Sequence, residues 1–135
     1  MSAPVDPQDW AIAAARAAAA KTDASASTVV LEVGDVLAIT GFFVISSGTN
    51  RRQVRAMAEE VEEKVVEAGG PKPLRIEGLD DGTWVLIDYG DVIVHLFDAE
   101  TREFYDIERL WRDARILAIG GGATEVMLEE VAKRY

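Results

Sequence analysis

The sequence contains no cysteine among its 135 residues. This absence excludes disulfide bonds, thiolate metal sites and cysteine nucleophiles. Positive charge is also scarce, because 14 lysine and arginine residues stand against 24 aspartate and glutamate residues, a formal charge of −10. Affinity for a phosphate backbone depends on clustered lysine and arginine, so we expect no direct nucleic-acid specificity. A basic protein surface suits such an acidic chain better.

A long uninterrupted apolar run is also missing. The longest, Val36 to Ile45, is broken by Thr40 and Gly41 and falls short of the ~20 residues that a membrane-spanning helix needs. The N-terminus carries no basic stretch ahead of an apolar one, which argues against a secretory signal. We therefore expect a soluble cytoplasmic protein without a membrane association.

The order of helical and extended patterns predicts an α/β fold. Residues 8–22 are rich in alanine and predict a helix, with Asp6 as its N-cap and Pro7 in its first turn. Apolar residues recur at helical spacing from Val54 to Ala68 and predict a second helix. Strands are predicted over residues 28–33, 41–47, 74–79, 84–88 and 91–97, and a short helix over 99–111. The predicted fold is a mixed five-stranded sheet flanked by helices, in the order α-β-β-α-β-β-β-α.

The chain divides into a body and a C-terminal extension. Residues 1–113 are predicted to form a single domain. In residues 114–135, Gly120-Gly121-Gly122 indicates a flexible linker, and Val126, Leu128 and Val131 indicate a helix after it.

The strands at 84–88 and 91–97 are separated by Tyr89-Gly90, which predicts an antiparallel hairpin. If Asp88 pairs with Asp91, alternation places a wholly apolar set on one face: Val85, Ile87, Val92, Val94 and Leu96. The opposite face is mixed and carries Trp84, Leu86, Asp88, Asp91, Ile93, His95 and Phe97. A mixed face meets either solvent or a specific partner. A lone histidine is equally often a hydrogen-bonded structural residue, and aspartates commonly flank tight turns, so both interpretations stay open.

The same stretch carries a set of motifs that is specific in combination. It comprises Glu77-Gly78, Trp84 before an apolar strand, Asp88-Tyr89-Gly90-Asp91, His95, and the run from Arg102 through Tyr105 to Leu110-Trp111. Together with Thr40–Ser47 and Asn50 to Val54, this set resembles the ribosomal silencing factor family, also called Iojap-like. The resemblance covers about residues 10–113. One departure is Gly41, where the family usually has an aspartate after the threonine.

The resemblance implies a translation repressor that is not an enzyme, needs no cofactor and binds no metal. Its implied partner is the large ribosomal subunit, bound through ribosomal protein fourteen so that the small subunit cannot join. The implied fold resembles that of nucleotidyltransferases. The implied contact residues are Trp84, Asp88, Tyr89, Asp91, His95, Tyr105 and Trp111. An exposed hairpin face also leaves a homodimer open.

The alternative is a nucleotide- or metal-binding enzyme. Asp88 and Asp91 would hold a metal, and the turn Ser47 to Arg52 would cradle a phosphate at a helix N-terminus. A nucleotidyltransferase site, however, needs a Gly-Ser pair at the helix start and an Asp-x-Asp on a neighbouring strand, and the sequence has neither. Thr49 as a helix N-cap explains the turn more simply.

Overall fold

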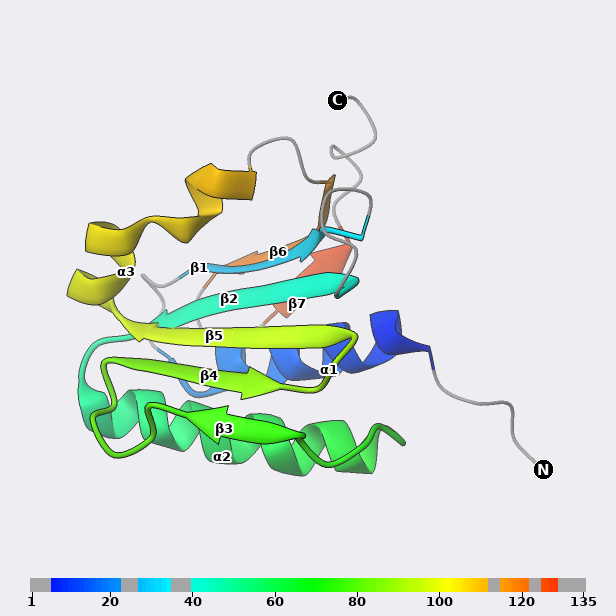
Figure 1. Ribbon diagram of the computed structural model, residues 1–135, viewed down its shortest axis with the longest axis horizontal. Coiled ribbons are helices and arrows are strands. Elements are labelled where there is room, and N and C mark those ends of the chain that lie inside the picture. The colour runs from blue at the N-terminus through cyan, green and yellow to red at the C-terminus, as the bar shows by residue number, and fades with distance from the viewer. Residues whose placement is uncertain (1–5, 23–26, 35–39, 112–114, 122–124, 129–135) are drawn as a thin grey trace.

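The computed structural model describes residues 6–22, 27–34, 40–111, 115–121 and 125–128 (Figure 1). The helices are α1 (Pro7–Ala20), α2 (Arg51–Glu67), α3 (Ala99–Tyr105) and the 3-10 helix η1 (Ile107–Trp111). The strands are β1 (Ser27–Glu32), β2 (Phe42–Gly48), β3 (Arg75–Glu77), β4 (Trp84–Asp88), β5 (Val92–Asp98), β6 (Arg115–Gly121) and β7 (Glu125–Leu128).

The strands form one mixed sheet in the order β3-β4-β5-β2-β1-β6-β7. Only β2 and β5 run parallel, and the other neighbouring pairs are antiparallel. A parallel pair needs a crossover, which α2, β3 and β4 supply. Strands β1 to β5 confirm the five-stranded mixed sheet expected from the sequence, and β2, central in the sheet, is buried along nearly its whole length.

Two helices cover one face of the sheet, behind it in the view of Figure 1. α1 begins at Asp6 and Pro7 as expected, and its buried residues are all alanine, so its backbone can approach the sheet closely. α2 buries Val54, Met57, Ala58, Val61 and Val65, the stripe that its periodicity predicts. We call this side the helix-covered face and the other side the open face.

The start of α2 is capped differently from the prediction. Asn50, not Thr49, is the N-cap, and its side-chain oxygen accepts a hydrogen bond of 2.9 Å from the Gln53 backbone N–H. Gln53 reaches back, and its Oε1 accepts from the Thr49 backbone N–H at 2.7 Å. The turn is therefore closed by its own side chains.

The C-terminal extension differs from the prediction wherever the structure describes it. Residues expected in a flexible linker form β6, which pairs with β1 from Glu32–Arg115 to Ser27–Gly121. The predicted helix begins instead as strand β7 on the outer side of β6, and Val131 lies outside the described residues. Pairing with the edge of β1 overrides the local preference of a glycine-rich segment.

Each face of the sheet has its own apolar core. The core on the helix-covered face includes α1, α2 and inward residues such as Val44, Val94 and Leu96. The core on the open face is smaller and comprises Val29, Leu31, Val33, Phe43, Ile45 and Phe97. No described helix is long and apolar enough to cross a membrane.

Candidate functional site

The β4–β5 hairpin turns one residue later than expected. The Tyr89 N–H donates to the Val92 carbonyl at 2.9 Å, so Gly90 and Asp91 are the central turn residues. Gly90 has φ +87° and Asp91 has no positive φ, the pattern of a type II′ turn, which favours glycine first.

The predicted register was therefore wrong by two residues. Trp84 pairs with Phe97 and Leu86 with His95, where the sequence argument paired Trp84 with His95. An even shift leaves every side chain on its predicted face. The mixed face is thus the open face of the sheet.

Trp84 and His95 form a hydrogen-bonded pair on the open face. The Trp84 Nε1–H donates to His95 Nδ1 at 3.2 Å. His95 is 6 % exposed, and its ring forms a T-shaped contact with the ring of Phe43, with centroids 4.8 Å apart. Burial lowers the pKa of His95 to about 4, which keeps the imidazole neutral near pH 7. Because Nδ1 accepts, the proton lies on Nε2. The structure thus gives His95 a structural hydrogen bond, and its partner is Trp84.

The aromatic contacts continue outward from Trp84. Its ring centroid lies 4.9 Å from that of Phe97 and 5.0 Å from that of Tyr105. Phe104 meets Tyr105 edge-on at 5.0 Å. Phe104 is 80 % and Tyr105 52 % exposed. The cluster therefore runs from the buried Phe97 to the exposed Phe104 and Tyr105. We call Phe104 and Tyr105 the aromatic rim.

Polar contacts fix the helix that carries this rim. The Asp98 side chain caps α3 by accepting from the Thr101 N–H at 2.8 Å. Arg102 reaches back to the sheet, where its Nη1 donates to the Ser47 hydroxyl at 3.1 Å. Its Nε and Nη2 donate to the two Glu108 carboxylate oxygens at 3.0 and 3.1 Å. This bidentate ion pair links α3 to η1.

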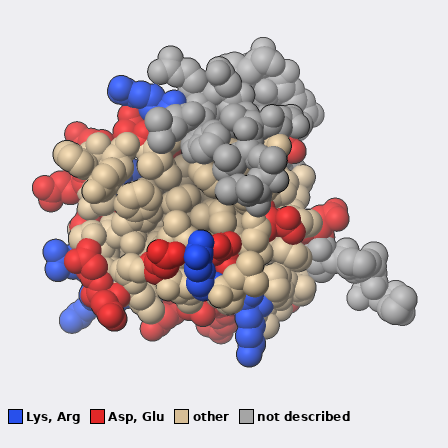
Figure 2. All heavy atoms as spheres, viewed as in Figure 1, with Lys and Arg blue, Asp and Glu red and all other residues tan. Residues whose placement is uncertain are grey.

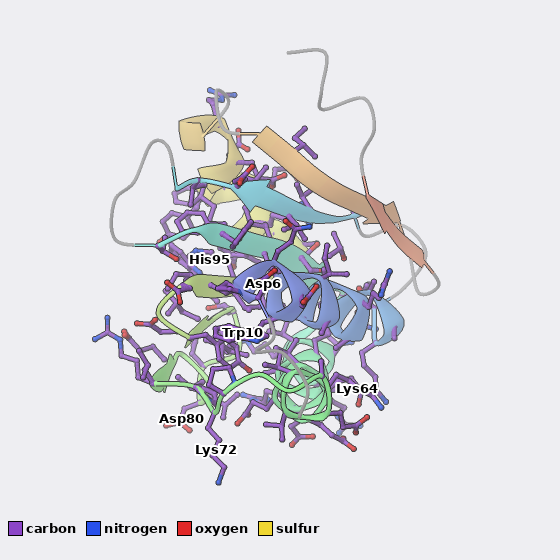
Figure 3. All side chains as sticks on the ribbon, turned by 90° about the vertical axis from the view of Figure 1, so that its right-hand side faces the viewer. Asp6, Trp10, Lys64, Lys72, Asp80 and His95 are labelled. Carbon is purple, nitrogen blue, oxygen red and sulfur yellow. The ribbon has the colours of Figure 1, made fainter. Side chains whose placement is uncertain are left out.

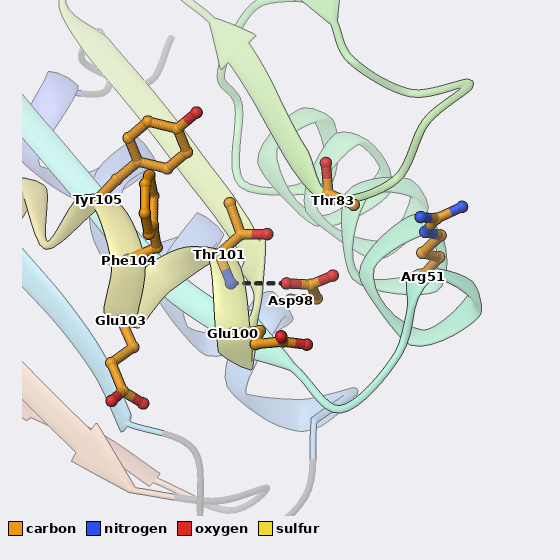
Figure 4. A pocket seen from close by; sticks show the side chains of 8 residues that line it. All are labelled: Arg51, Thr83, Asp98, Glu100, Thr101, Glu103, Phe104 and Tyr105. Carbon is orange, nitrogen blue, oxygen red and sulfur yellow. Dashed lines mark hydrogen bonds between the residues drawn. The ribbon is translucent and has the colours of Figure 1, made fainter.

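A hollow lies beside the aromatic rim (Figure 4). We call it the acidic hollow; its volume is about 630 Å³ and it is lined by Arg51, Thr83, Asp98, Glu100, Thr101, Glu103, Phe104 and Tyr105. Phe104 and Tyr105 form one wall in the close view, and Arg51 and Thr83 lie across from them. Three carboxylates against one guanidinium give the hollow a net negative charge.

A second depression lies farther along the open face. We call it the central groove; its volume is about 410 Å³ and it is lined by Thr40, Phe43, Leu74, Arg75, Leu86, Asp88, Gly90, Ile93 and His95. The sequence argument missed Thr40, Phe43, Leu74 and Arg75 as groove residues. Their position depends on β2 and β3 lying beside the hairpin, which no local pattern reveals.

The two aspartates do not face each other as expected. Asp88 Oδ2 lies 3.2 Å from Arg75 Nε of β3, and its Oδ1 accepts from the Gly90 N–H at 2.8 Å. Asp91 is exposed in the turn. The shift of the turn by one residue separates them, and Asp88 pairs with Ile93 in place of Asp91.

Tyr89, an expected contact residue, does not lie on the open face with Trp84 and His95. It is 4 % exposed and packs in the core of the helix-covered face, where burial raises the pKa of its hydroxyl. Alternation from Val85 and Ile87 already points Tyr89 to that side, so the hairpin pattern could have excluded it. Trp111 lies in η1, and its side chain is outside the described residues.

Figure 2 views the open face directly: its described middle part is largely uncharged, and basic and acidic side chains lie together across its lower part and around its edge. The sheet seen edge-on places His95 on the side away from Lys64 of α2 (Figure 3). The Trp84–His95 pair and the central groove, which His95 lines, therefore lie on one face of the molecule, and the acidic hollow borders the cluster at Phe104 and Tyr105.

The residues of the enzyme alternative do not assemble into a metal centre. Among the residues that the structure describes, no three histidine, aspartate or glutamate side chains lie close enough together to hold a metal ion. In the turn Ser47 to Arg52, the Thr49 and Gln53 N–H groups already donate to side chains of the turn itself. Neither half of that alternative gains support.

Comparison with known proteins gives a consistent result. The family described as "Ribosomal silencing factor during starvation" matches residues 4–134. The match continues past residue 113, where the motifs quoted from the sequence end. "Ribosomal silencing factor RsfS" of Bacillus subtilis (strain 168) is 34 % identical over 110 residues, 81 % of this chain and 92 % of that protein.

A mouse relative and a solved structure agree. "Mitochondrial assembly of ribosomal large subunit protein 1" of Mus musculus is 36 % identical over 84 residues, 61 % of this chain and 37 % of that protein. A crystal structure of a Chromobacterium violaceum protein superposes with a TM-score of 0.72 at 31 % identity, covering 80 % of this chain and 88 % of that one. The likeness to nucleotidyltransferases stays a prediction.

Proposed function

The chain belongs to the ribosomal silencing factor family, and from that premise we propose that it represses translation in the cytoplasm by a steric, non-catalytic mechanism. It binds the large ribosomal subunit through ribosomal protein fourteen, on the surface that faces the small subunit. While it is bound, the small subunit cannot join. The mouse relative, whose name concerns the large subunit, supports this choice of partner.

The observation that carries the proposal is the aromatic rim of the open face. Phe104 and Tyr105 are adjacent and mostly exposed. Tyr105 packs on Trp84, whose indole N–H donates a hydrogen bond to the buried His95. Exposed neighbouring aromatics are costly in a free monomer and typical of the anchors of protein interfaces. A pre-organised aromatic anchor loses little conformational entropy on binding.

Charge supports a basic partner. The chain carries a formal charge of −10, and Glu100 and Glu103 lie beside the aromatic rim in the acidic hollow. Complementary charge around an apolar anchor speeds association and fixes orientation. The exposed Asp91 adds negative charge at the far end of the hairpin.

The test is co-sedimentation of the protein with isolated large subunits, followed by addition of small subunits. We expect binding and blocked joining. Tyr105→Ala should weaken binding by about tenfold or more, as truncation of an interface anchor does. Trp84→Ala is a poorer choice, because Trp84 is half-buried against Phe97 and its loss also disturbs packing.

A matched control comes from the opposite side of the molecule. Val66 is also an exposed apolar residue, at 49 %, but it belongs to α2, which covers the opposite face of the sheet (Figure 1). Val66→Ala should bind like the wild type. If the wild type leaves subunit joining unaffected, or if Tyr105→Ala binds as well as Val66→Ala, the proposed mechanism or the assigned face is wrong.

A further inference from the structure

The aromatic rim forms one wall of the acidic hollow (Figure 4). Phe104 is 80 % exposed, and its ring contacts that of Tyr105 in a T-shaped arrangement with centroids 5.0 Å apart. Tyr105 is 52 % exposed and packs on Trp84. Neighbouring aromatic side chains that stay in water cost the free protein energy. The part of these rings that borders the hollow is therefore available to an incoming group.

A carboxylate lies next to the aromatic rim on the same helix. Glu100 and Phe104 are four residues apart in α3, so their side chains are neighbours on one side of the helix. Glu100 is exposed, lines the hollow and makes no ion pair with another described side chain. Glu103 is exposed and lines the hollow as well. Because the face of an aromatic ring is itself electronegative, a carboxylate beside an exposed ring attracts a cation.

The helix that carries these groups is held in place before a partner binds. Asp98 caps the start of α3 by accepting from the Thr101 N–H. Arg102 donates to the Ser47 hydroxyl of β2 and to both carboxylate oxygens of Glu108. A pre-organised wall loses little conformational entropy when a group packs on it.

The charges around the hollow decide which kind of group suits it. An anion would meet the three carboxylates of the lining, and a neutral apolar group would leave them unpaired. Among the described residues that line the hollow, Arg51 is the single basic one. The Thr83 hydroxyl and, to a smaller extent, Arg51 lower the pKa of Asp81, so Arg51 already has an acidic neighbour outside the lining. A cation is therefore favoured.

Among cations, the guanidinium group of arginine suits an aromatic wall beside a carboxylate. It is planar and weakly hydrated, packs on aromatic rings and can donate two hydrogen bonds to one carboxylate. The ammonium group of lysine is compact and strongly hydrated, and it cannot lie flat on a ring.

We propose that the acidic hollow receives an arginine side chain of the ribosomal protein partner, with its guanidinium group against the aromatic rim and paired with Glu100. This inference rests on the proposed function and names the group that the partner inserts beside the rim. Glu103 adds negative charge at the edge of the hollow. Arg51, which lies across from the rim (Figure 4), opposes the incoming positive charge.

The first experiment compares Glu100→Gln, Glu103→Gln and Glu59→Gln for binding to isolated large ribosomal subunits, with thermal unfolding to check that each variant folds. Each change removes one negative charge. Glu59 is exposed on α2 and is the matched control. Glu100→Gln should weaken binding about tenfold and flatten its dependence on salt. Glu103→Gln should weaken binding about twofold, and Glu59→Gln should bind like the wild type.

Two further variants test the sign of the charge and the ring contact. Arg51→Ala removes the opposing positive charge, so binding should tighten about twofold. Phe104→Leu keeps an apolar side chain and loses the ring, so binding should weaken about fivefold.

The outcomes separate the two proposals. Glu100→Gln that binds like Glu59→Gln overturns the inference, while the proposed function stands if Tyr105→Ala still loses binding. Tighter binding of Glu100→Gln together with weaker binding of Arg51→Ala would assign the hollow to a phosphate of ribosomal RNA, which also overturns it. Phe104→Leu that binds like the wild type overturns the contact between guanidinium and ring. If the wild type does not bind large subunits at all, the proposed function fails, and this inference fails with it.

Discussion

The two faces of the β4–β5 hairpin are built from the same two strands and differ in almost every physical respect. The helix-covered face presents Val85, Ile87, Val92, Val94 and Leu96, all fully buried. The open face presents Trp84, Leu86 and Ile93, which are half-buried, around a buried histidine. One face is a uniform aliphatic layer, and the other combines aromatic, charged and unsatisfied polar groups.

This difference separates the residues that hold the fold from those available for binding. Aliphatic burial is non-directional and contributes in proportion to the area removed from water. The open face contributes less, because its side chains keep part of their surface in water and two of its buried polar atoms, His95 Nε2 and the Thr40 hydroxyl oxygen, are unpaired. A partner that binds to this face can bury the side chains that are still partly in water.

The largest expected effect comes from the helix-covered face. Leu96→Ala should destabilise the protein by about 2–5 kcal/mol, because Leu96 is fully buried between the sheet and the helices. Leu86→Ala, on the open face of the neighbouring strand, should cost about 1 kcal/mol or less, since Leu86 is half-buried. Urea unfolding measures both. Equal losses would mean that the two faces contribute alike to stability.

The sequence predicted which residues share each face of the β4–β5 hairpin, because side chains along a strand alternate with a period of two. The register error of two residues left Trp84 and His95 on the correct face, although it placed Asp91 on a strand and not in the turn. The turn was misplaced because both Tyr89-Gly90 and Gly90-Asp91 are plausible centres, and the hydrogen bond from the Tyr89 N–H to the Val92 carbonyl, which the sequence does not reveal, decides between them. The sequence of a hairpin therefore predicts on which face of the sheet each side chain lies more reliably than which residues pair across the two strands.

The next effect is a dependence of stability on pH that His95 alone controls. It is the single histidine of the chain, and burial lowers its pKa to about 4 from about 6.5 in the unfolded chain. Between these values the unfolded state binds a proton that the folded state does not. The contribution of His95 to the free energy of unfolding is therefore constant above about pH 7 and falls by roughly 3 kcal/mol as the pH drops to 4.

The useful window is pH 7 to 5.5, where ordinary carboxylates stay ionised. There the free energy of unfolding should fall by about 1 kcal/mol in the wild type. In His95→Asn it should be flat. A wild type that is equally stable at pH 7 and 5.5 would show that His95 is accessible to water, and the contrast between the two faces would weaken.

The site was less predictable than the fold because its parts come from distant segments. Arg75 meets Asp88 only because β3 lies beside β4, and Thr40, which precedes β2, lines the same groove as His95 only through the parallel pairing of β2 with β5. Strands β6 and β7 were missed for the same reason, since a glycine-rich segment becomes a strand by pairing with β1. The exposed pair Phe104-Tyr105 carried a usable signal, because two adjacent residues of a short helix cannot both face a core.

A smaller effect tests whether the open face depends on polar contacts. Arg102→Lys should cost roughly 1–2 kcal/mol, because lysine cannot reproduce the forked hydrogen bonds to Glu108 and the bond to Ser47. Urea unfolding measures the loss, and hydrogen exchange should show α3 opening more often. The control is Arg109→Lys, whose ion pair with Asp106 is largely exposed and should contribute almost nothing. Equal effects of the two changes would contradict a specific role for Arg102.

The smallest expected effect concerns the charges at the rim of the central groove. Arg75 is mostly exposed and its contact with Asp88 is 3.2 Å, so Asp88→Asn should change stability by less than about 0.5 kcal/mol. The asparagine oxygen still accepts from the Gly90 N–H, which preserves the turn. If Asp88 guides a basic partner, the association rate with large subunits should fall and its dependence on salt should flatten, with little change in dissociation. Stopped-flow mixing at two salt concentrations separates these rates. A loss of stability above 1 kcal/mol would instead make the ion pair part of the fold, and the open face would then resemble the helix-covered face more than its composition suggests.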